Sequence, residues 1–362
     1  MLNKVKIINI YLDIDFYFYI RELFNRLSKY MGISLKDIAQ ALNLSKATVS
    51  WVLSGQGNAR GISEERIKEV QEYAAKVNYC PNRLARSLFT GTTQTLGLII
   101  PFIGDTFFAQ IAQAVEIEAE KQGYVLTICS YRRDGQREIR LIQILREKQV
   151  DGLIIVPSEK TQDIFGQLLC EKVPFVLIDR CFPQLKTNYV IFDNTGGSYR
   201  LTESLIRRNC RKIAYINTDV HLSVMGLRLK GYISALEDNN MSFDNNLYVE
   251  ISTDNYLNET NEKIEYLLKN VPDVDGIVFS THYLAIETIR CFTQMKIPYR
   301  EQFKIASFHS NTALEVLVPD ITIARVMIEE MGRAAVNILL ENIKRQDMEK
   351  KELILDISYE RN

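Results

Sequence analysis

Ser34 to Leu53 read SLKDIAQALNLSKATVSWVL, two short segments with apolar residues at helical spacing and only a few residues between them. The apolar positions of the first segment are Leu35, Ile38, Ala39 and Leu42. In the second segment Val49, Val52 and Leu53 form the inward face, and Ala47 is small. Because each helix then has one apolar face, the two are expected to pack on each other. The pattern predicts a helix-turn-helix, although a helical hairpin inside another core has the same pattern.

The residues around the turn favour the first interpretation. Asn43 stands where the chain must turn sharply, which suits a residue that tolerates left-handed backbone angles. Ser45 is placed to cap the second helix. Lys, Thr and Ser at an exposed helix N-terminus suit phosphates and base edges in a major groove. We therefore expect DNA contacts from this helix start, with base readout by Lys46 and Ala47, phosphate contacts by Thr48 and Ser50, and undecided roles for Ser45 and Trp51.

A third helix is predicted after Ser63, because Ser63 is a typical cap and Glu64 and Glu65 fall in the first turn. Its apolar face consists of Ile67, Val70, Tyr73, Ala74 and Val77. Three such helices can close a small DNA-binding core. Further along, Leu96 to Pro101 have the continuous apolar pattern of a buried strand.

Taken in order, these features resemble the lactose/galactose repressor (LacI/GalR) family of bacterial transcription factors. The matching elements are Lys-Asp-Ile-Ala before the turn, Ser-x-Ala-Thr-Val-Ser in the second helix, Tyr-x-Pro-Asn-x-x-Ala-Arg-Ser-Leu after the third, and Gly-Leu-Ile-x-Pro. They span Ser34 to Pro101, and a looser likeness continues to the end of the chain. The resemblance implies that residues 82–89 form a hinge helix in the minor groove of operator DNA. Asn82, Arg83, Ala85 and Leu88 would contact DNA there, with Leu88 wedged between base steps.

The composition fits two or three folding units. The chain of 362 residues exceeds an ordinary domain, and its 46% hydrophobic content is enough for substantial cores. The formal net charge of -1 gives no global signal for nucleic acid, but residues 31–95 hold eight Lys and Arg against five Asp and Glu. A small DNA-binding unit attached to a near-neutral larger domain has this distribution.

Cysteine and histidine spacing indicates no metal site. The six cysteines show no Cys-x-x-Cys spacing, so we expect reduced, buried thiols in a cytoplasmic protein. The three histidines show no ligand spacing either, and no metal or other cofactor is expected. No apolar run reaches about 18 residues and no signal-peptide pattern appears, so no membrane partner is expected.

Residues 1–30 form an extension of their own. Ile7–Tyr19 is apolar and aromatic, but Asp13 and Asp15 interrupt it, so it is too short and too charged to span a bilayer. It is either an extra element that packs on the DNA-binding unit or a segment upstream of the true start. Because Met31 directly precedes the resemblance, we expect translation to begin there.

From Leu96 onward, apolar strand-like runs alternate with helical stretches. The predicted strands are Leu96–Ile100, Val125–Cys129, Gly152–Val156, Phe175–Ile178, Val190–Phe192, Lys212–Ile216, Gly276–Phe279 and Lys304–Ser307. Such alternation predicts parallel sheets covered on both faces, and the length suits two of them. The resemblance implies a periplasmic-binding-protein-like α/β domain of two Rossmann-like lobes around a ligand cleft. The expected domains are the helix-turn-helix at 31–78, a hinge and linker at 79–94, and a two-lobed effector-binding and dimerisation domain at 95–362.

Ligands in open α/β sheets bind at the carboxyl ends of the strands, so the loops after the predicted strands are the candidates for an effector site. Arg228, ahead of a Gly-Tyr pair, resembles the family's effector-binding arginine, which suits bidentate bonds to hydroxyls or a carboxylate. The other candidates are Phe107, Phe108, Asp179, Asp193, His282 and His309. Phe108 as a core residue and Asp193 as a helix cap remain open alternatives.

Residues 307–309 depart from the family, which usually has Gly-Tyr-Asp where this chain has Ser-Phe-His. A carboxylate accepts two hydrogen bonds and a neutral imidazole accepts one, so the usual sugar contact cannot be carried over to His309. The effector is then a sugar bound differently, a phosphorylated or acidic ligand, or absent. A simple surface substitution at His309 is equally open.

The sequence therefore predicts a sequence-specific transcriptional regulator whose affinity for double-stranded operator DNA is set by a sugar or another small molecule. We expect a repressor, although an activator would use the same parts. The expected partners are operator DNA, this effector and a second copy in a homodimer. The alternative is a cleft-type solute-binding protein without a DNA role. An enzyme is not predicted, because no Gly-x-Gly-x-x-Gly follows the first strand and no nucleophile with a base is suggested.

Overall fold

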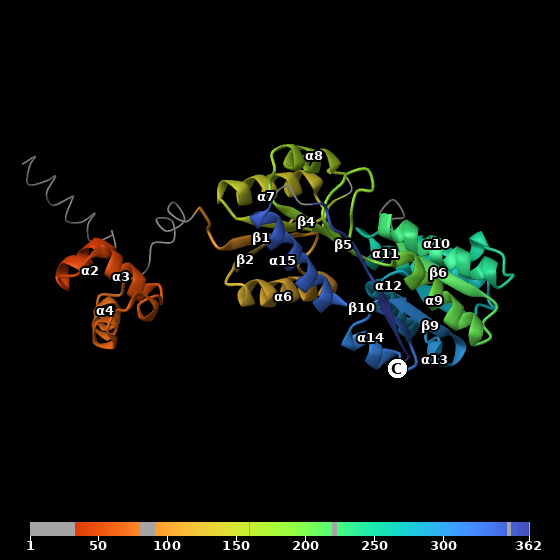
Figure 1. The fold of residues 1–362 in the computed structure, drawn as a ribbon. Coiled ribbons are helices and arrows are strands. Elements are labelled where there is room, and N and C mark those ends of the chain that lie inside the picture. Colours follow the sequence, from red (N-terminus) through yellow and green to blue (C-terminus); the bar gives the residue numbers. More distant parts are fainter. Residues whose placement is uncertain (1–32, 80–90, 159, 219–222, 346–348, 362) are drawn as a thin grey trace, which may run out of the picture. The chain divides into compact units, whose positions relative to one another are not determined.

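The computed structural model describes residues 33–79, 91–158, 160–218, 223–345 and 349–361, and the chain divides into two compact units, Met1–Gly91 and Thr92–Asn362 (Figure 1). The extension at 1–30 and most of the predicted hinge at 79–94 lie outside the described residues. The bounds given to the hinge therefore stay a prediction.

The first unit is a small helical bundle. Its elements are α2 (Leu35–Ala41), α3 (Lys46–Leu53), the 3-10 turn η1 (Asn58–Arg60) and α4 (Glu64–Lys76). The core predicted from the apolar spacing is confirmed, because Ile38, Ala39, Val49, Val52, Val70 and Ala74 are buried together. The turn between α2 and α3 is also as predicted, since Asn43 has a left-handed φ of 51°.

The helix starts of this unit confirm one predicted cap and correct another. Ser45 Oγ accepts the Thr48 backbone N–H at 3.0 Å, which satisfies a free donor of the first turn of α3. Ser34 and Asp37 form a reciprocal capping box at the start of α2. Ser63 stands at the N-cap of α4, but its side chain makes no capping hydrogen bond. The prediction of a side-chain cap there was wrong, and Glu64 and Glu65 alone complement the positive end of the helix dipole.

The second unit holds two six-stranded sheets (Figure 1). The first has the order β11-β5-β4-β3-β1-β2 and is parallel throughout. Its strands are β1 (Thr95–Ile100), β2 (Val125–Ser130), β3 (Gly152–Ile155), β4 (Phe175–Ile178), β5 (Tyr189–Phe192) and β11 (Glu352–Leu355). Two parallel sheets were predicted, and each forms one lobe.

The second sheet has the order β12-β10-β9-β8-β6-β7, with the edge strand β12 antiparallel to β10 and the others parallel. Its strands are β6 (Ile213–Thr218), β7 (Tyr248–Ile251), β8 (Gly276–Phe279), β9 (Lys304–Phe308), β10 (Thr322–Val326) and β12 (Ile357–Arg361). The eight strands predicted from apolar runs are present. β7, β10, β11 and β12 were not predicted, because three of them are edge strands and each contains a charged residue.

Helices cover both faces of each sheet, as the continuous apolar strands predicted. On the first sheet, α6 (Thr106–Lys121) and α15 (Ile328–Lys344) pack on one face, and α7 (Gly135–Glu147) and α8 (Gln162–Cys170) on the other. On the second sheet, α9 (Asn194–Arg207) and α10 (Ser223–Asp238) cover one face. The opposite face is covered by α11 (Tyr256–Asn270), α12 (His282–Gln294) and α14 (Thr312–Leu317), with the short α13 (Tyr299–Gln302) nearby.

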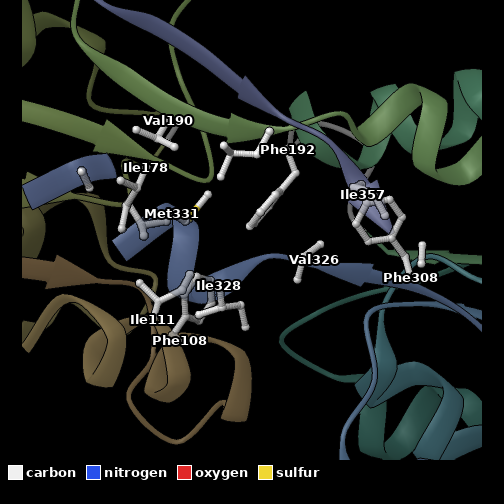
Figure 2. Packing of buried hydrophobic residues seen from close by; sticks show 14 of the residues in the cluster. Phe108, Ile111, Ile178, Val190, Phe192, Phe308, Val326, Ile328, Met331 and Ile357 are labelled. Carbon is white, nitrogen blue, oxygen red and sulfur yellow. The ribbon is translucent and has the colours of Figure 1, made fainter. Parts of the chain in front are cut away.

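The chain crosses between the lobes three times: from β5 into α9, from β10 into α15 and from β11 into β12. One buried cluster runs along these crossings from Phe108 in the first lobe to Phe308 in the second (Figure 2). Phe192, Val326 and Ile357 lie between them at the crossover strands. The continuous cluster joins the two lobes, and the carboxyl ends of both sets of parallel strands face the same region.

Candidate functional site

The outward face of α3 carries the residues predicted to contact DNA. Ser45, Lys46, Ala47 and Ser50 are exposed, whereas Thr48 and Trp51 are half-buried. The Thr48 hydroxyl is already hydrogen-bonded to Ser45 Oγ at 2.8 Å. Asn82, Arg83, Ala85 and Leu88, the other predicted DNA-binding residues, lie outside the described residues. The polar surface at the start of α3 is thus present, and its role stays a prediction.

Trp51 has a partner that the sequence analysis did not identify. The guanidinium carbon of Arg60, on η1, lies 5.0 Å from the centre of the indole ring. A cation over an aromatic face is stabilised by the ring quadrupole, and the stacked ring limits the freedom of the arginine. Arg60 itself is exposed. The α3 surface therefore extends to a second basic residue through Trp51, a contact between residues nine positions apart that helical periodicity does not predict.

A cavity of about 160 Å³ lies at the carboxyl ends of the strands of both sheets. Its wall comes from residues at or just after the ends of β1, β2, β3 and β4 in the first lobe and of β7, β8, β9 and β10 in the second, together with residues of α10. Six of the seven residues predicted to bind an effector line it: Phe107, Phe108, Asp179, Arg228, His282 and His309. Phe108 also belongs to the buried core, which confirms the core interpretation, while its contact with an effector stays a prediction.

Arg228 lies in this wall as a buried cation. Its Nε donates to Asn194 Oδ1 at 2.8 Å, and one Nη donates to the Ser280 carbonyl at 2.7 Å. Its guanidinium carbon is 3.6 Å from the centre of the Phe308 ring. Burial lowers the pKa of Arg228 to about 10, while the nearby Asp179 carboxylate works in the opposite direction. Arg228 therefore remains charged at neutral pH, and three neutral groups hold its guanidinium in place.

The two residues that follow Arg228 in the predicted motif explain how its helix is placed. A Cβ at Gly231 would lie 2.1 Å from the Thr195 carbonyl oxygen and 2.8 Å from the Tyr199 nitrogen, so α10 and α9 touch at their backbones. Tyr232 is fully buried and donates its hydroxyl to the Ile213 carbonyl at 2.8 Å. The Gly-Tyr pair thus fixes α10 against α9 and β6, and Arg228, one turn earlier, reaches the cavity.

His282 and His309 stand next to each other, with ring centres 5.2 Å apart and perpendicular planes. His282 Nε2 lies 3.0 Å from Thr106 Oγ1 and 3.7 Å from Asp105 Oδ1. Neither ring nitrogen of His309 has a hydrogen-bond partner among the described residues. Burial lowers the pKa of both rings, that of His309 to about 3, and the positive charge of Arg228 adds to the effect. Both imidazoles are therefore neutral at neutral pH.

His309 is buried, with an exposed fraction of 9%. This corrects the alternative that it is a simple surface substitution. Its ring also contacts Phe107, with centres 5.2 Å apart. Asp179 is equally inaccessible, and its carboxylate lies 3.5 Å from Arg180 Nε. An aromatic ring at the start of α6, an imidazole after β9 and a carboxylate after β4 therefore meet in this cavity.

Asp193 does not line the cavity, which corrects its assignment as an effector ligand. It is the N-cap of α9, and its Oδ1 accepts the Gly196 backbone N–H at 2.8 Å. The carboxylate satisfies a donor of the first helical turn and is stabilised by the helix dipole. Asp193 is therefore a helix cap, the alternative that the sequence left open. Its neighbour Asn194 takes part instead, by accepting from Arg228.

Five charged residues of the wall were not predicted: Asp105, Arg133, Lys160, Arg180 and Asp254. Arg133 and Asp254 come from opposite lobes and approach to 3.7 Å, and Arg133 also donates to the Thr253 carbonyl at 3.3 Å. Each follows a strand closely, so the rule that ligands bind after parallel strands could have identified them. Charged residues in polar loops have no distinctive sequence pattern of their own. Only their position after a parallel strand distinguishes these cavity residues from ordinary surface residues.

Among the described residues no group of three or more His, Cys, Asp or Glu is placed to hold a metal ion, and no helix is long and apolar enough to cross a membrane. The described cysteines are free. The expectation that they are all buried was wrong, because Cys170 is exposed at the end of α8 and only Cys210 and Cys291 are buried.

Two family models match the chain and together cover both units. Residues 34–82 match the model described as bacterial regulatory proteins of the lacI family. Residues 93–360 match the model described as periplasmic binding proteins and sugar binding domain of the LacI family. The second match alone spans well over half of the sequence.

Similar proteins include the ribose operon repressor of Halalkalibacterium halodurans, 27% identical, over 87% of this chain and 92% of the relative. The HTH-type transcriptional repressor PurR of Aliivibrio salmonicida is also 27% identical, over 88% of this chain and 94% of the relative. Among solved structures, the Lac repressor bound to ONPG in the repressed state superposes with a TM-score of 0.78 at 21% identity, over 91% of this chain and 98% of that one. At that identity the likeness shows a common fold.

Proposed function

The chain belongs to the LacI family of bacterial regulatory proteins, and we propose that it is a DNA-binding transcriptional repressor whose operator affinity is controlled by a small molecule in the cavity of the second unit. Residues of α3 contact operator DNA in this account, and the second unit binds the effector. The active form is a homodimer in the cytoplasm, with one operator half-site for each copy.

One observation carries the effector part of the proposal. Residues from segments that are far apart in the sequence and lie in both lobes meet around a single cavity that holds a buried arginine, two buried histidines and a buried aspartate. Buried polar groups that converge on a cavity between two lobes are typical of a small-molecule site. A ligand that contacts both walls also has different contacts in open and closed arrangements of the lobes, which a regulatory ligand requires.

The alternative function, a solute-binding protein without a DNA role, does not account for the first unit. The α2–α3 pair has a buried core and an exposed, polar helix start with Lys46 and Ser50. Such a helix start is suited to phosphates and base edges. We therefore assign base contacts to Lys46 and Ala47 and phosphate contacts to Ser50 and Thr48. Arg60, held by Trp51, is placed beside the same DNA phosphates.

The experiment has two stages. Operator sequences are first selected from random double-stranded oligonucleotides with the purified full chain, and binding is then measured by fluorescence anisotropy at one fixed salt concentration. We expect one enriched, approximately palindromic site, as two symmetric copies require. A panel of sugars, sugar acids and sugar phosphates is then added to the complex. Release of the operator by at least one compound supports the proposal, whereas failure to enrich any sequence contradicts its DNA-binding part.

A further inference from the structure

The charge of Arg228 has no counter-charge in direct contact. No carboxylate lies within 4.0 Å of its guanidinium among the described residues, and its two hydrogen bonds go to the neutral oxygens of Asn194 and Ser280. The second Nη of Arg228 makes no hydrogen bond to any of the described residues. Buried charges in proteins are normally paired, because desolvation disfavours an isolated ion. The pattern is that of a group that binds an anionic oxygen from outside the chain.

His309 adds a hydrogen-bond donor at the same place. A neutral imidazole has one N–H donor and one acceptor nitrogen, and neither ring nitrogen is used within the described residues. An unsatisfied buried polar atom destabilises the folded chain, so a ligand that pairs with both nitrogens removes this cost for each of them. The N–H suits a carboxylate or phosphate oxygen, and the acceptor nitrogen suits a hydroxyl group.

The N-terminus of α12 faces the same cavity. Thr281, His282 and Tyr283 line the wall, and Thr281 at the N-cap makes no side-chain hydrogen bond to the first turn. The free N–H groups of a helix start and the positive end of its dipole favour anions. This helix has 13 residues, so its dipole is fully developed. By contrast, Asp105 and Asp193 cap the starts of α6 and α9 with their own carboxylates.

The whole wall carries a small positive excess. Four cationic side chains, Arg133, Lys160, Arg180 and Arg228, face three carboxylates, Asp105, Asp179 and Asp254, when both histidines are neutral. Asp179, which is buried and can only accept hydrogen bonds when ionised, suits hydroxyl groups of a ligand. The cavity volume of about 160 Å³ is below the range of roughly 300–1,000 Å³ of sites for drug-sized ligands. It therefore fits one sugar-sized molecule.

We propose that the effector is a small polyhydroxy compound with one anionic group, a carboxylate or a phosphate, that is bound by Arg228, His309 and the N-terminus of α12, while Asp179 accepts its hydroxyl groups. This inference rests on the proposed function only in taking the cavity as the effector site. It makes His309 the residue that selects an acidic ligand over the neutral sugar of the same skeleton.

The test compares matched pairs: D-glucose with D-glucuronate and D-glucose 6-phosphate, D-galactose with D-galacturonate, and D-ribose with D-ribose 5-phosphate. Binding to the full chain is measured by isothermal titration calorimetry, and stabilisation by the rise in melting temperature. We expect at least one anionic member to bind about tenfold or more tightly than its neutral partner, as one charge-assisted contact allows. The uronate and phosphate arms decide which anionic group is used. Equal or tighter binding of the neutral members, or no preference in any pair, overturns the inference.

Two variants of His309 separate selection from folding. His309→Asn keeps a donor and an acceptor without charge, and Asn tolerates the left-handed backbone of this position. It should retain the preference for the anion. His309→Asp places an acceptor-only charge there and should lose or reverse that preference. Gln143→Glu, an equal charge change on the exposed face of α7, is the control and should alter nothing. If both His309 variants keep the wild-type preference, the assignment of His309 is wrong.

Operator binding without any ligand is measured in parallel for each variant. Loss of operator enrichment for the wild type would contradict the proposed function and leave the ligand preference to be judged from calorimetry. Preference for neutral sugars with intact operator release would contradict this inference alone.

Discussion

Asp179 and His309 occupy equivalent backbone positions in the two lobes. Each is the first residue after a central parallel strand, β4 or β9, and each has a left-handed φ, +64° for Asp179 and +66° for His309. Each also donates its backbone N–H to the adjacent strand, to the carbonyl of Val190 and of Ala324 respectively, at 3.0 Å. Left-handed non-glycine residues are uncommon and occur often at functional sites. The two lobes thus present a carboxylate and an imidazole to one cavity through the same backbone conformation, a left-handed residue directly after a parallel strand.

The close contact between α9 and α10 supports a prediction at Gly231. Gly231→Ala should lower the free energy of unfolding by about 1–3 kcal/mol, because the added Cβ overlaps the backbone of α9. The matched control is Gly166→Ala in α8, where nothing lies within 4 Å of the added methyl group. That variant should gain about 0.5–1 kcal/mol from helix propensity. Urea unfolding of both variants checks this, and equal stability changes would contradict the backbone contact.

Glu138 supports a prediction about pH. It is fully buried on α7, where its carboxylate accepts the Ser158 backbone N–H at 3.0 Å and the Thr161 hydroxyl at 2.8 Å, and so holds the loop that carries Ser158 to the cavity. Burial raises the pKa of Glu138 from 4.5 to about 7, against the effect of these hydrogen bonds. Between these two pH values the folded chain therefore retains a proton that the unfolded chain has lost.

The free energy of unfolding of the wild type, relative to Glu138→Gln, should consequently fall as the pH rises from about 4.5 to about 7, by up to about 3 kcal/mol in total. The stabilisation that the protonated Glu138 carboxyl provides is fully present below the unfolded-state pKa of 4.5 and lost above the folded-state pKa of about 7. Gln cannot titrate, and it keeps one acceptor oxygen for the loop. Urea unfolding at pH 5 and pH 8 measures the difference. A difference between the two proteins that does not change with pH would show that the carboxyl is not buried as described.

Lys46 and Thr48 should respond differently to replacement. Lys46→Ala should relax the preference at one base pair, with a cost of about 1–3 kcal/mol for the preferred base. Thr48→Val should weaken binding to all sequences alike, because phosphate contacts carry no sequence information. Repeating the operator selection with each variant measures both effects. A Lys46 variant with an unchanged base preference would rule out its assignment to base readout.

Much of the fold follows from the sequence, and physical reasons explain the rest. Apolar spacing predicted α2, α3 and α4, and apolar runs predicted eight strands, seven of them inside the sheets, because buried elements leave a recognisable apolar pattern. The edge strand β12 contains Glu360 and Arg361 and gives no such signal. Six of seven effector candidates reached the cavity, since ligand loops follow parallel strands. Asp193 also follows a strand, but the helix N-terminus that comes next takes its carboxylate, and position after a strand cannot separate these two roles.

The measurement that tests the central claim most directly is operator affinity with and without the identified effector, for the wild type and Arg228→Ala. The account predicts that the effector weakens operator binding of the wild type, whereas the variant binds the operator with wild-type affinity in effector-free buffer and no longer responds to the compound. Arg228→Lys, which keeps the charge but not the fork of donors, should respond only partly. A normal effector response of Arg228→Ala would contradict the account, because the cavity would then not be the site through which operator affinity is controlled.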